Sequence, residues 1–427
     1  MTSTPPACGG GRRQLRRSAI PRALAVLVVV AAIATGCTAA EEELPRWATA
    51  TARPAPEPSV DAPATAPGDD LRVTEVIGTE PVTVEVGPED VSWSIGVIAP
   101  TADELVGIRR VVDPAGEVRY LADLRNELLL VDELHPRVLA DAGAVGLYVT
   151  SEPGAPLAAG TWTVDVVANA GTPTSRVVVR SAADVDAAPQ RLDVVVWATA
   201  EVPEPAALAA AWRAAADGVL GPHGMAIGRL EVVPAPEGAA GPFRTLGVDG
   251  LAAPVHAACD AAAEATGADP RTAVVVLSER IGEGVLTAAA GAGPGGVAYR
   301  APDGDIEGYA VATPGTPVTG PASHACVAVS AGDDPTAVGL VALHEVLHQA
   351  GITRHTTERT GRDFDRLADT PECPLDPHDA DGDLEVTRAE CTGLDADNLM
   401  FWAVGGTALT DDQAWRIRRH PLLHPEG

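Results

Sequence analysis

Two histidines flanking a glutamate form the most specific chemical pattern in the chain. In the run His344-Glu345-Val346-Leu347-His348 the imidazoles stand one helical turn apart, on the same face of a helix. Imidazoles at that spacing can bind one zinc ion. Glu345 then lies where its carboxylate can take a proton from a zinc-bound water as general base. The alternative interpretation is a solvated helix that carries two unrelated histidines.

The residues after this pair offer a third ligand. Gly351 is suited to end the helix in a left-handed conformation and to turn the chain back toward the metal. His355 follows shortly, and we predict it as the third zinc ligand because imidazole suits zinc. An acid, Asp363 or Asp365, is the alternative at that position.

The helix that presents the pair has a clear start signal. Asp334 can cap it, Pro335 suits the first helical position, and an apolar stripe continues over residues 335–350. Buried strand-like segments and helical segments alternate over residues 190–427. We therefore predict an α/β (α+β) domain there, with a last helix opened by the capping box of Thr410 and Gln413.

Met400 lies downstream, in the segment Asp397-Asn398-Leu399-Met400-Phe401-Trp402, which resembles a Met-turn. With it, the pattern resembles the metzincin metallopeptidases. The segments His355-Thr356-Thr357-Glu358 and Ala368-Asp369-Thr370-Pro371-Glu372-Cys373 are most similar to the pappalysin-type branch. The residues in matching roles are His344, Glu345, His348, Gly351, His355 and Met400.

This resemblance implies a metzincin-like catalytic domain from about residue 192 to the C-terminus. It implies a mixed sheet above a cleft, a smaller irregular part below, and peptide substrate extended along an edge strand, which we place just before Gly332. The chain departs from the family pattern by having three residues, not two, between Gly351 and His355. Arg354 therefore occupies the usual ligand position, and Trp402 stands where several metzincins carry a tyrosine.

An acidic loop lies between Cys373 and Cys391. Its oxygen ligands at alternate positions suit calcium, with an EF-hand-like register that starts at Asp379 and has Leu384 in place of the usual glycine. A solvated acidic loop held by a disulfide is the equal alternative. The candidate calcium ligands are Asp379, Asp381, Asp383, Glu385 and Glu390.

The N-terminal residues predict export. Residues 1–36 combine an arginine-rich start with an apolar run and end in Ala34-Thr35-Gly36, directly before Cys37. The segment Ala34-Thr35-Gly36-Cys37 resembles a lipobox, so we predict a lipoprotein signal peptide and lipidation of Cys37. Ordinary cleavage with an incidental cysteine is the alternative. Residues 37–70 predict a Pro/Ala-rich disordered tether. We expect an extracytoplasmic bacterial lipoprotein, at the cell surface or in the periplasm.

Residues 71–182 predict an all-β sandwich accessory domain. Short alternating runs such as 82–86 and 161–167 are bounded by Gly, Pro and Asp. Trp93 and Trp162 are predicted core residues, since an alternating strand places one face inward. The stretch 156–162 resembles the jelly-roll modules that accompany secreted bacterial peptidases.

The cysteines predict two disulfides, and the net charge limits the kinds of molecule that the chain can bind. Once Cys8 leaves with the leader and Cys37 is lipidated, four cysteines remain, and we predict the disulfides Cys373–Cys391 and Cys259–Cys326. With 59 acidic and 30 basic residues, the net charge of −29 disfavours nucleic acid as a partner. We expect a monomer that contacts the membrane through Cys37 and acts on a protein or peptide.

The leading hypothesis is a lipid-anchored zinc endopeptidase with Glu345 as general base. A second hypothesis is a catalytically silent surface-binding lipoprotein that keeps the metallopeptidase fold. A third is a zinc peptidase that uses a distant glutamate as third ligand.

Overall fold

The computed structural model describes residues 70–426, except 102–103, 124–127, 135–139, 182–184, 249–252, 284, 289–296, 301–304, 311–314, 316–324 and 404. These residues belong to one compact unit, assigned to Pro45–Gly427. The predicted leader, Cys37 and the predicted tether before residue 70 lie outside the described residues. Within the described ranges, no helix has the length and apolar character that a membrane crossing requires.

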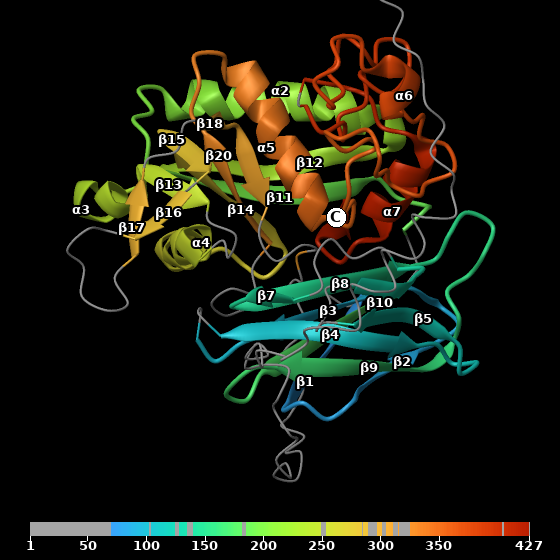
Figure 1. Cartoon of the computed structure of the whole chain (residues 1–427). Helices are drawn as coiled ribbons and strands as arrows, with labels where there is room; N and C mark the ends of the chain where they lie inside the picture. Colours follow the sequence, from blue (N-terminus) through green and yellow to red (C-terminus); the bar gives the residue numbers. More distant parts are fainter. Residues whose placement is uncertain are drawn as a thin grey trace, which may run out of the picture. The chain divides into compact units, whose positions relative to one another are not determined.

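The N-terminal part consists, among the described residues, of strands in two antiparallel sheets (Figure 1). The strands are β1 (Leu71–Ile77), β2 (Val82–Val86), β3 (Asp90–Ile98), β4 (Leu105–Val112), β5 (Val118–Asp123), β6 (Leu128–Asp132), β7 (Ala140–Ala142), β8 (Ala144–Thr150), β9 (Gly160–Ala168) and β10 (Thr174–Ser181). One antiparallel sheet has the order β1-β10-β3-β8, and the other has the order β2-β9-β4-β5-β6 with β7 beside β4. The predicted all-β sandwich is therefore present.

The core of the sandwich comes from the inward residues of alternating strands. Val82, Val84 and Val86 on β2 are buried while the residues between them are exposed. Trp93 and Trp162 are both buried, and their rings meet edge to face with centroids 5.6 Å apart. Their predicted place in the core is confirmed.

The second part is built on a mixed sheet with helices on both faces. Its elements are β11 (Gln190–Ala198), α2 (Pro205–Leu220), β12 (Met225–Pro234), α3 (Glu237–Ala240), β13 (Thr245–Val248), α4 (Ala253–Thr266), β14 (Thr272–Ser278), β15 (Arg280–Glu283), β16 (Val285–Ala288), β17 (Val297–Arg300), β18 (Asp305–Ile306), β19 (Gly308–Ala310), β20 (Cys326–Ser330), α5 (Pro335–Gln349), α6 (Leu375–His378), α7 (Asp411–Arg419) and β21 (Leu423–Pro425).

The main sheet has the order β12-β11-β14-β20-β19. Strands β12, β11, β14 and β20 are parallel, whereas β19 pairs antiparallel with β20 at the edge. The strand before Gly332, which we predicted as the edge, is β20 and lies inside the sheet. That prediction is wrong among the described residues, and β19 takes the edge position.

Alternate residues of the buried strand β14 face different helices. Val275 packs in the cluster that contains α2 and α5, whereas Val274 and Val276 pack with α4. The disulfide Cys259–Cys326 joins α4 to β20, and Cys373–Cys391 closes the acidic loop. Both predicted disulfides are therefore formed.

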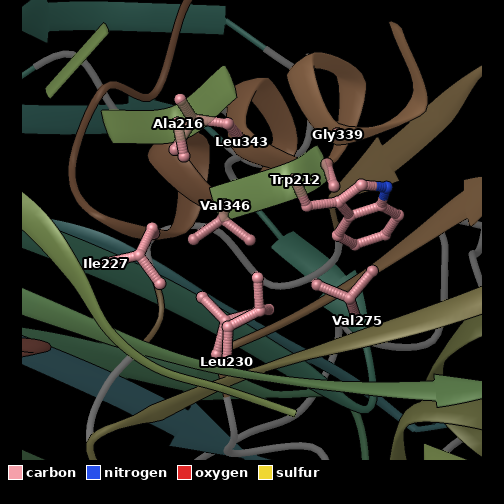
Figure 2. A pocket seen from close by; sticks show the side chains of 10 residues that line it. Trp212, Ala216, Ile227, Leu230, Val275, Gly339, Leu343 and Val346 are labelled. Atoms are coloured by element: carbon pink, nitrogen blue, oxygen red, sulfur yellow. The ribbon is translucent and has the colours of Figure 1, made fainter. Parts of the chain in front are cut away.

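Helix α5 is pressed closely against α2. A Cβ atom on Gly339 would lie 2.8 Å from Cδ1 of Trp212, so only glycine allows the two helices to approach this closely. Apolar side chains from both helices and the sheet surround a cavity of about 20 Å³ at this crossing (Figure 2). A space this small and apolar is a packing void. The contact fixes α5, which carries the histidine pair, on the sheet.

Candidate metal centre

Both ends of α5 are set by local sequence. The side chain of Asp334 accepts hydrogen bonds from the amides of Thr336 and Ala337, as an N-cap does. At the other end Gly351 adopts φ +98°, and the amide of Ile352 donates to the carbonyl of Leu347. This is a Schellman ending, which turns the chain directly after the second histidine of the pair.

Each of the three histidines is held through its Nδ1 atom. Nδ1 of His344 lies 2.6 Å from the carbonyl oxygen of Leu399, and Nδ1 of His348 lies 2.6 Å from that of Ile352. A carbonyl can only accept, so each of these Nδ1 atoms carries the proton and leaves a lone pair on Nε2. The two helix imidazoles are thereby fixed in the tautomer that ligates a metal through Nε2.

His355 is oriented by a carboxylate rather than a carbonyl. Its Nδ1 lies 2.8 Å from Oε2 of Glu358, in the carboxylate–histidine arrangement that supports many metal ligands. The ring is mostly buried, and its Nε2 lies 3.3 Å from Nε2 of His348. Two nitrogens bound to one tetrahedral zinc ion stand about 3.3 Å apart, so this spacing fits a shared metal.

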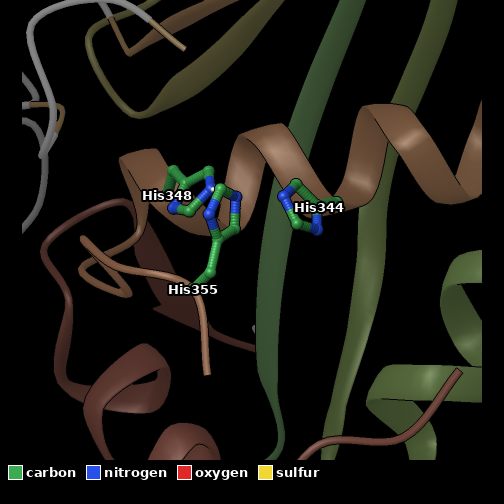
Figure 3. Close-up of side chains that lie close together, drawn as sticks. All are labelled: His344, His348 and His355. Carbon is green, nitrogen blue, oxygen red and sulfur yellow. Dashed lines mark hydrogen bonds between the residues drawn. The ribbon is translucent and has the colours of Figure 1, made fainter. Parts of the chain in front are cut away.

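The three rings converge on one point. His344 and His348 project from α5, and His355 extends toward them from the following loop (Figure 3). One ligating atom from each residue lies within 4.8 Å of the other two, so the group could hold a metal ion. Lone pairs directed at one another repel unless a cation lies between them, and this donor set therefore fits a metal.

The loop after His355 is pinned to a tight turn at residues 398–401. The amide of Phe401 donates to the carbonyl of Asn398, and Met400 is fully buried in the core. The same turn supplies the Leu399 carbonyl to His344, while the Met400 carbonyl accepts the amide of Thr356. The turn predicted around Met400 therefore braces both histidine-bearing segments.

A buried carboxylate fastens this loop further. Asp395 accepts the hydroxyl protons of Thr356 and Thr357, the two residues that follow His355. Burial raises the pKa of Asp395, although both hydroxyl hydrogen bonds oppose that shift. Trp402 lies nearby, but its indole N–H is committed to the carbonyl of Val386 and its ring to Arg359.

Glu345 is buried beside the edge strand. A Cβ on Gly308 of β19 would lie 2.6 Å from Cγ and 2.8 Å from Oε1 of Glu345. The edge strand therefore passes directly against this carboxylate, and a larger residue at position 308 would require the Glu345 side chain to shift. Sequence reasoning missed Gly308, because nothing in the local pattern of Glu307-Gly308-Tyr309 indicates a distant neighbour.

The alternative third ligands lie elsewhere. The backbone amide of Asp365 donates a hydrogen bond to the carbonyl of His355, and the Asp365 carboxylate accepts one from the hydroxyl of Thr370. Burial raises the pKa of Asp365 to about 6. The carbonyl of Asp363 accepts the amide of Glu358, and neither acid belongs to the histidine group. Arg354 pairs with Asp132.

The acidic loop is only partly assembled as a cation site. Asp379, Asp381 and Asp383 come within 4.8 Å of one another and could hold an ion. Glu385 instead pairs with Arg359, and Glu390 accepts the amides of Ala380 and Thr387. Leu384 has φ +69°, which explains why a glycine is usual at that position of such loops. Calcium binding stays a prediction.

We expect Glu358→Gln to lower zinc affinity about 10- to 100-fold, because the amide cannot supply the negative charge that strengthens His355 as a ligand. Competition with a chromophoric chelator measures the change. Glu372→Gln is the matched control, since Glu372 is exposed on the same irregular segment. Equal zinc affinity in the two variants would contradict the assigned role of Glu358.

Comparison with known proteins identifies no family. The sequence matches no protein-family model and no curated protein. Among solved structures, a glycosylation-associated protein complex from Streptococcus agalactiae aligns with 52% of this chain and 69% of that chain, at 8% identity and a TM-score of 0.13. A TM-score this low carries no argument about fold or function.

Proposed function

We propose that the chain is a zinc-dependent endopeptidase of metzincin type, most similar to the pappalysin branch. The convergence of His344, His348 and His355, each with Nδ1 engaged by an oxygen, is the observation that carries this proposal. The fold supports it through a mixed sheet with an antiparallel edge strand beside Glu345. The turn at Met400 lends further support, since it braces both histidine segments.

The roles of the residues follow from their places. Zinc, when bound, polarises the scissile carbonyl and makes a water acidic enough to attack near neutral pH. Glu345 accepts the proton from the attacking water and delivers it to the leaving amine. Among the described residues β19 is the last strand in the order of the main sheet, so an extended peptide added alongside it would carry its backbone past Glu345. We therefore propose β19, rather than β20, as the strand along which the substrate binds.

The proposed setting is outside the cytoplasm. The two disulfides are typical of an oxidising compartment, and lipidation of Cys37 would hold the protein at a membrane. The acidic surface fits a protein or peptide substrate better than nucleic acid. We expect the enzyme to act as a monomer.

We expect the purified protein, lacking only its leader, to contain about one zinc per chain and to hydrolyse casein. A chelator should reduce that hydrolysis on the order of 100-fold, and added zinc should restore it. Elemental analysis and a fluorescent casein assay give the two readings. Zinc without turnover would instead favour the silent binding lipoprotein, and the absence of both would reject the proposal.

A further inference from the structure

The sandwich contacts the C-terminal part through buried polar groups. Arg180 of β10, which is 1% exposed, donates to the carbonyls of Arg418 and His420 at 2.6 and 2.7 Å. Ser92 donates to the carbonyl of Arg419, and Trp415 donates to that of Ser151. Separating the two parts would cost these buried hydrogen bonds, so the contact is specific as well as close.

One side chain of the sandwich packs against the end of the metal-bearing helix. A Cβ on Gly351 would lie 2.6 Å from both Cδ1 and Cε1 of Tyr148, so the tyrosine ring lies directly against the Gly351 backbone. The Tyr148 hydroxyl donates to the carbonyl of Arg416, and its ring meets that of His420 with centroids 4.7 Å apart. The turn that follows His348 is therefore supported from the sandwich side.

A second sandwich residue ties down the segment around His355. The carboxylate of Asp132, at the end of β6, lies 3.4 Å from Arg354 and 3.6 Å from Arg366. Its side chain is 10% exposed, and its carbonyl accepts a further hydrogen bond of 2.7 Å from Arg366. Arg354 directly precedes His355, and Arg366 follows Asp365, whose amide donates to the His355 carbonyl.

We propose that the β-sandwich holds the third metal ligand in place, with Asp132 as a positioning residue that acts through Arg354. The inference rests on the proposed function, because it concerns the zinc that this function requires. Residues 352–354, between Gly351 and His355, lie outside helices and strands, so their backbone would have more conformational freedom than that of α5. Pairing Arg354 with a mostly buried carboxylate removes that freedom and directs the neighbouring imidazole toward the helix. The sandwich is thus part of the metal site's support rather than a separate binding module.

Asp132→Asn tests this proposal by its effect on the metal. We expect zinc affinity, measured by chelator competition, to fall about tenfold, the lower end of the range for residues that support a ligand from behind. The visible absorption of the cobalt-substituted protein should weaken as the third nitrogen is lost from part of the population. Glu75→Gln is the control, because it breaks an ion pair with Arg176 between two strands of the sandwich itself.

Arg354→Met provides the second arm. It should lower zinc affinity to a similar extent, and the double variant should be little worse than either single variant, since both remove the same contact. If Asp132→Asn loses its native circular dichroism, Arg354→Met alone carries the test. Unchanged affinity and cobalt absorption in the folded variants would overturn the positioning role while the wild type still binds zinc. A wild type that binds no zinc would instead reject the proposed function.

Discussion

Replacing Glu345 with glutamine is expected to abolish peptide hydrolysis while zinc stays bound. The amide keeps the size of the side chain beside Gly308 but cannot accept the proton of the attacking water. General base catalysis contributes up to about 10⁴-fold, so we expect kcat to fall by about 10³-fold or more, roughly 4 kcal/mol of transition-state stabilisation. Turnover of a fluorogenic peptide and the bound zinc, measured on the same sample, test this together.

The control for Glu345→Gln is the same substitution at a glutamate that forms an ion pair away from the three histidines. Glu279 forms an ion pair with Arg244 at the surface, so Glu279→Gln should leave kcat unchanged. Retention of most activity by Glu345→Gln would contradict the general base assignment. Loss of zinc in that variant would show that Glu345 helps to hold the metal, and the loss of activity would then reflect the missing zinc instead of a missing general base.

Local signals in the sequence predicted the helix that bears the metal pair. Asp334, Pro335 and Gly351 act on backbone groups within a few residues, so their effect does not depend on the rest of the fold. The alternation on β2 and the capping box at Thr410 are local in the same sense, and both are present. Four cysteines can pair in only about three ways, which is why both disulfides could also be predicted.

The edge strand could not be placed in the same way. A strand as short as Gly308–Ala310 is too brief to show any periodicity, and its place in a sheet depends on which partner it finds along the chain. The run before Gly332 had the stronger strand pattern because β20 is buried on both faces. The same apolar character that made this strand easy to predict is the reason that it lies inside the sheet.

The role of the sandwich was hidden for a different reason. Its contact with the C-terminal part is made by arginines and by backbone carbonyls, and charged residues in a sequence are ordinarily assigned to solvent. Arg180 is nevertheless buried, and the burial of its guanidinium lowers its pKa to about 10. Hydrophobic patterning separates the two parts correctly but contains no information about a polar interface between them.

Removal of the third imidazole is the second change with a large expected effect. His355→Ala leaves two nitrogens on α5 and removes the partner of Glu358, so zinc affinity should fall by more than the roughly 10- to 100-fold loss typical of a supporting residue. Proteolysis should be lost with it. Elemental analysis after dialysis against a weak chelator measures retention of the metal.

Asp365→Asn separates this assignment from its alternatives. The carboxylate of Asp365 bonds to Thr370, and only its amide contacts the His355 backbone, so zinc should remain in that variant. Loss of zinc from Asp365→Asn with retention in His355→Ala would make the acid the ligand. Retention in both would favour a distant glutamate. Glu358 contacts the ring of His355 directly, and the Arg354–Asp132 pair anchors the backbone next to it. Because these contacts hold the imidazole toward the other two histidines, we expect His355→Ala to lose zinc and Asp365→Asn to retain it.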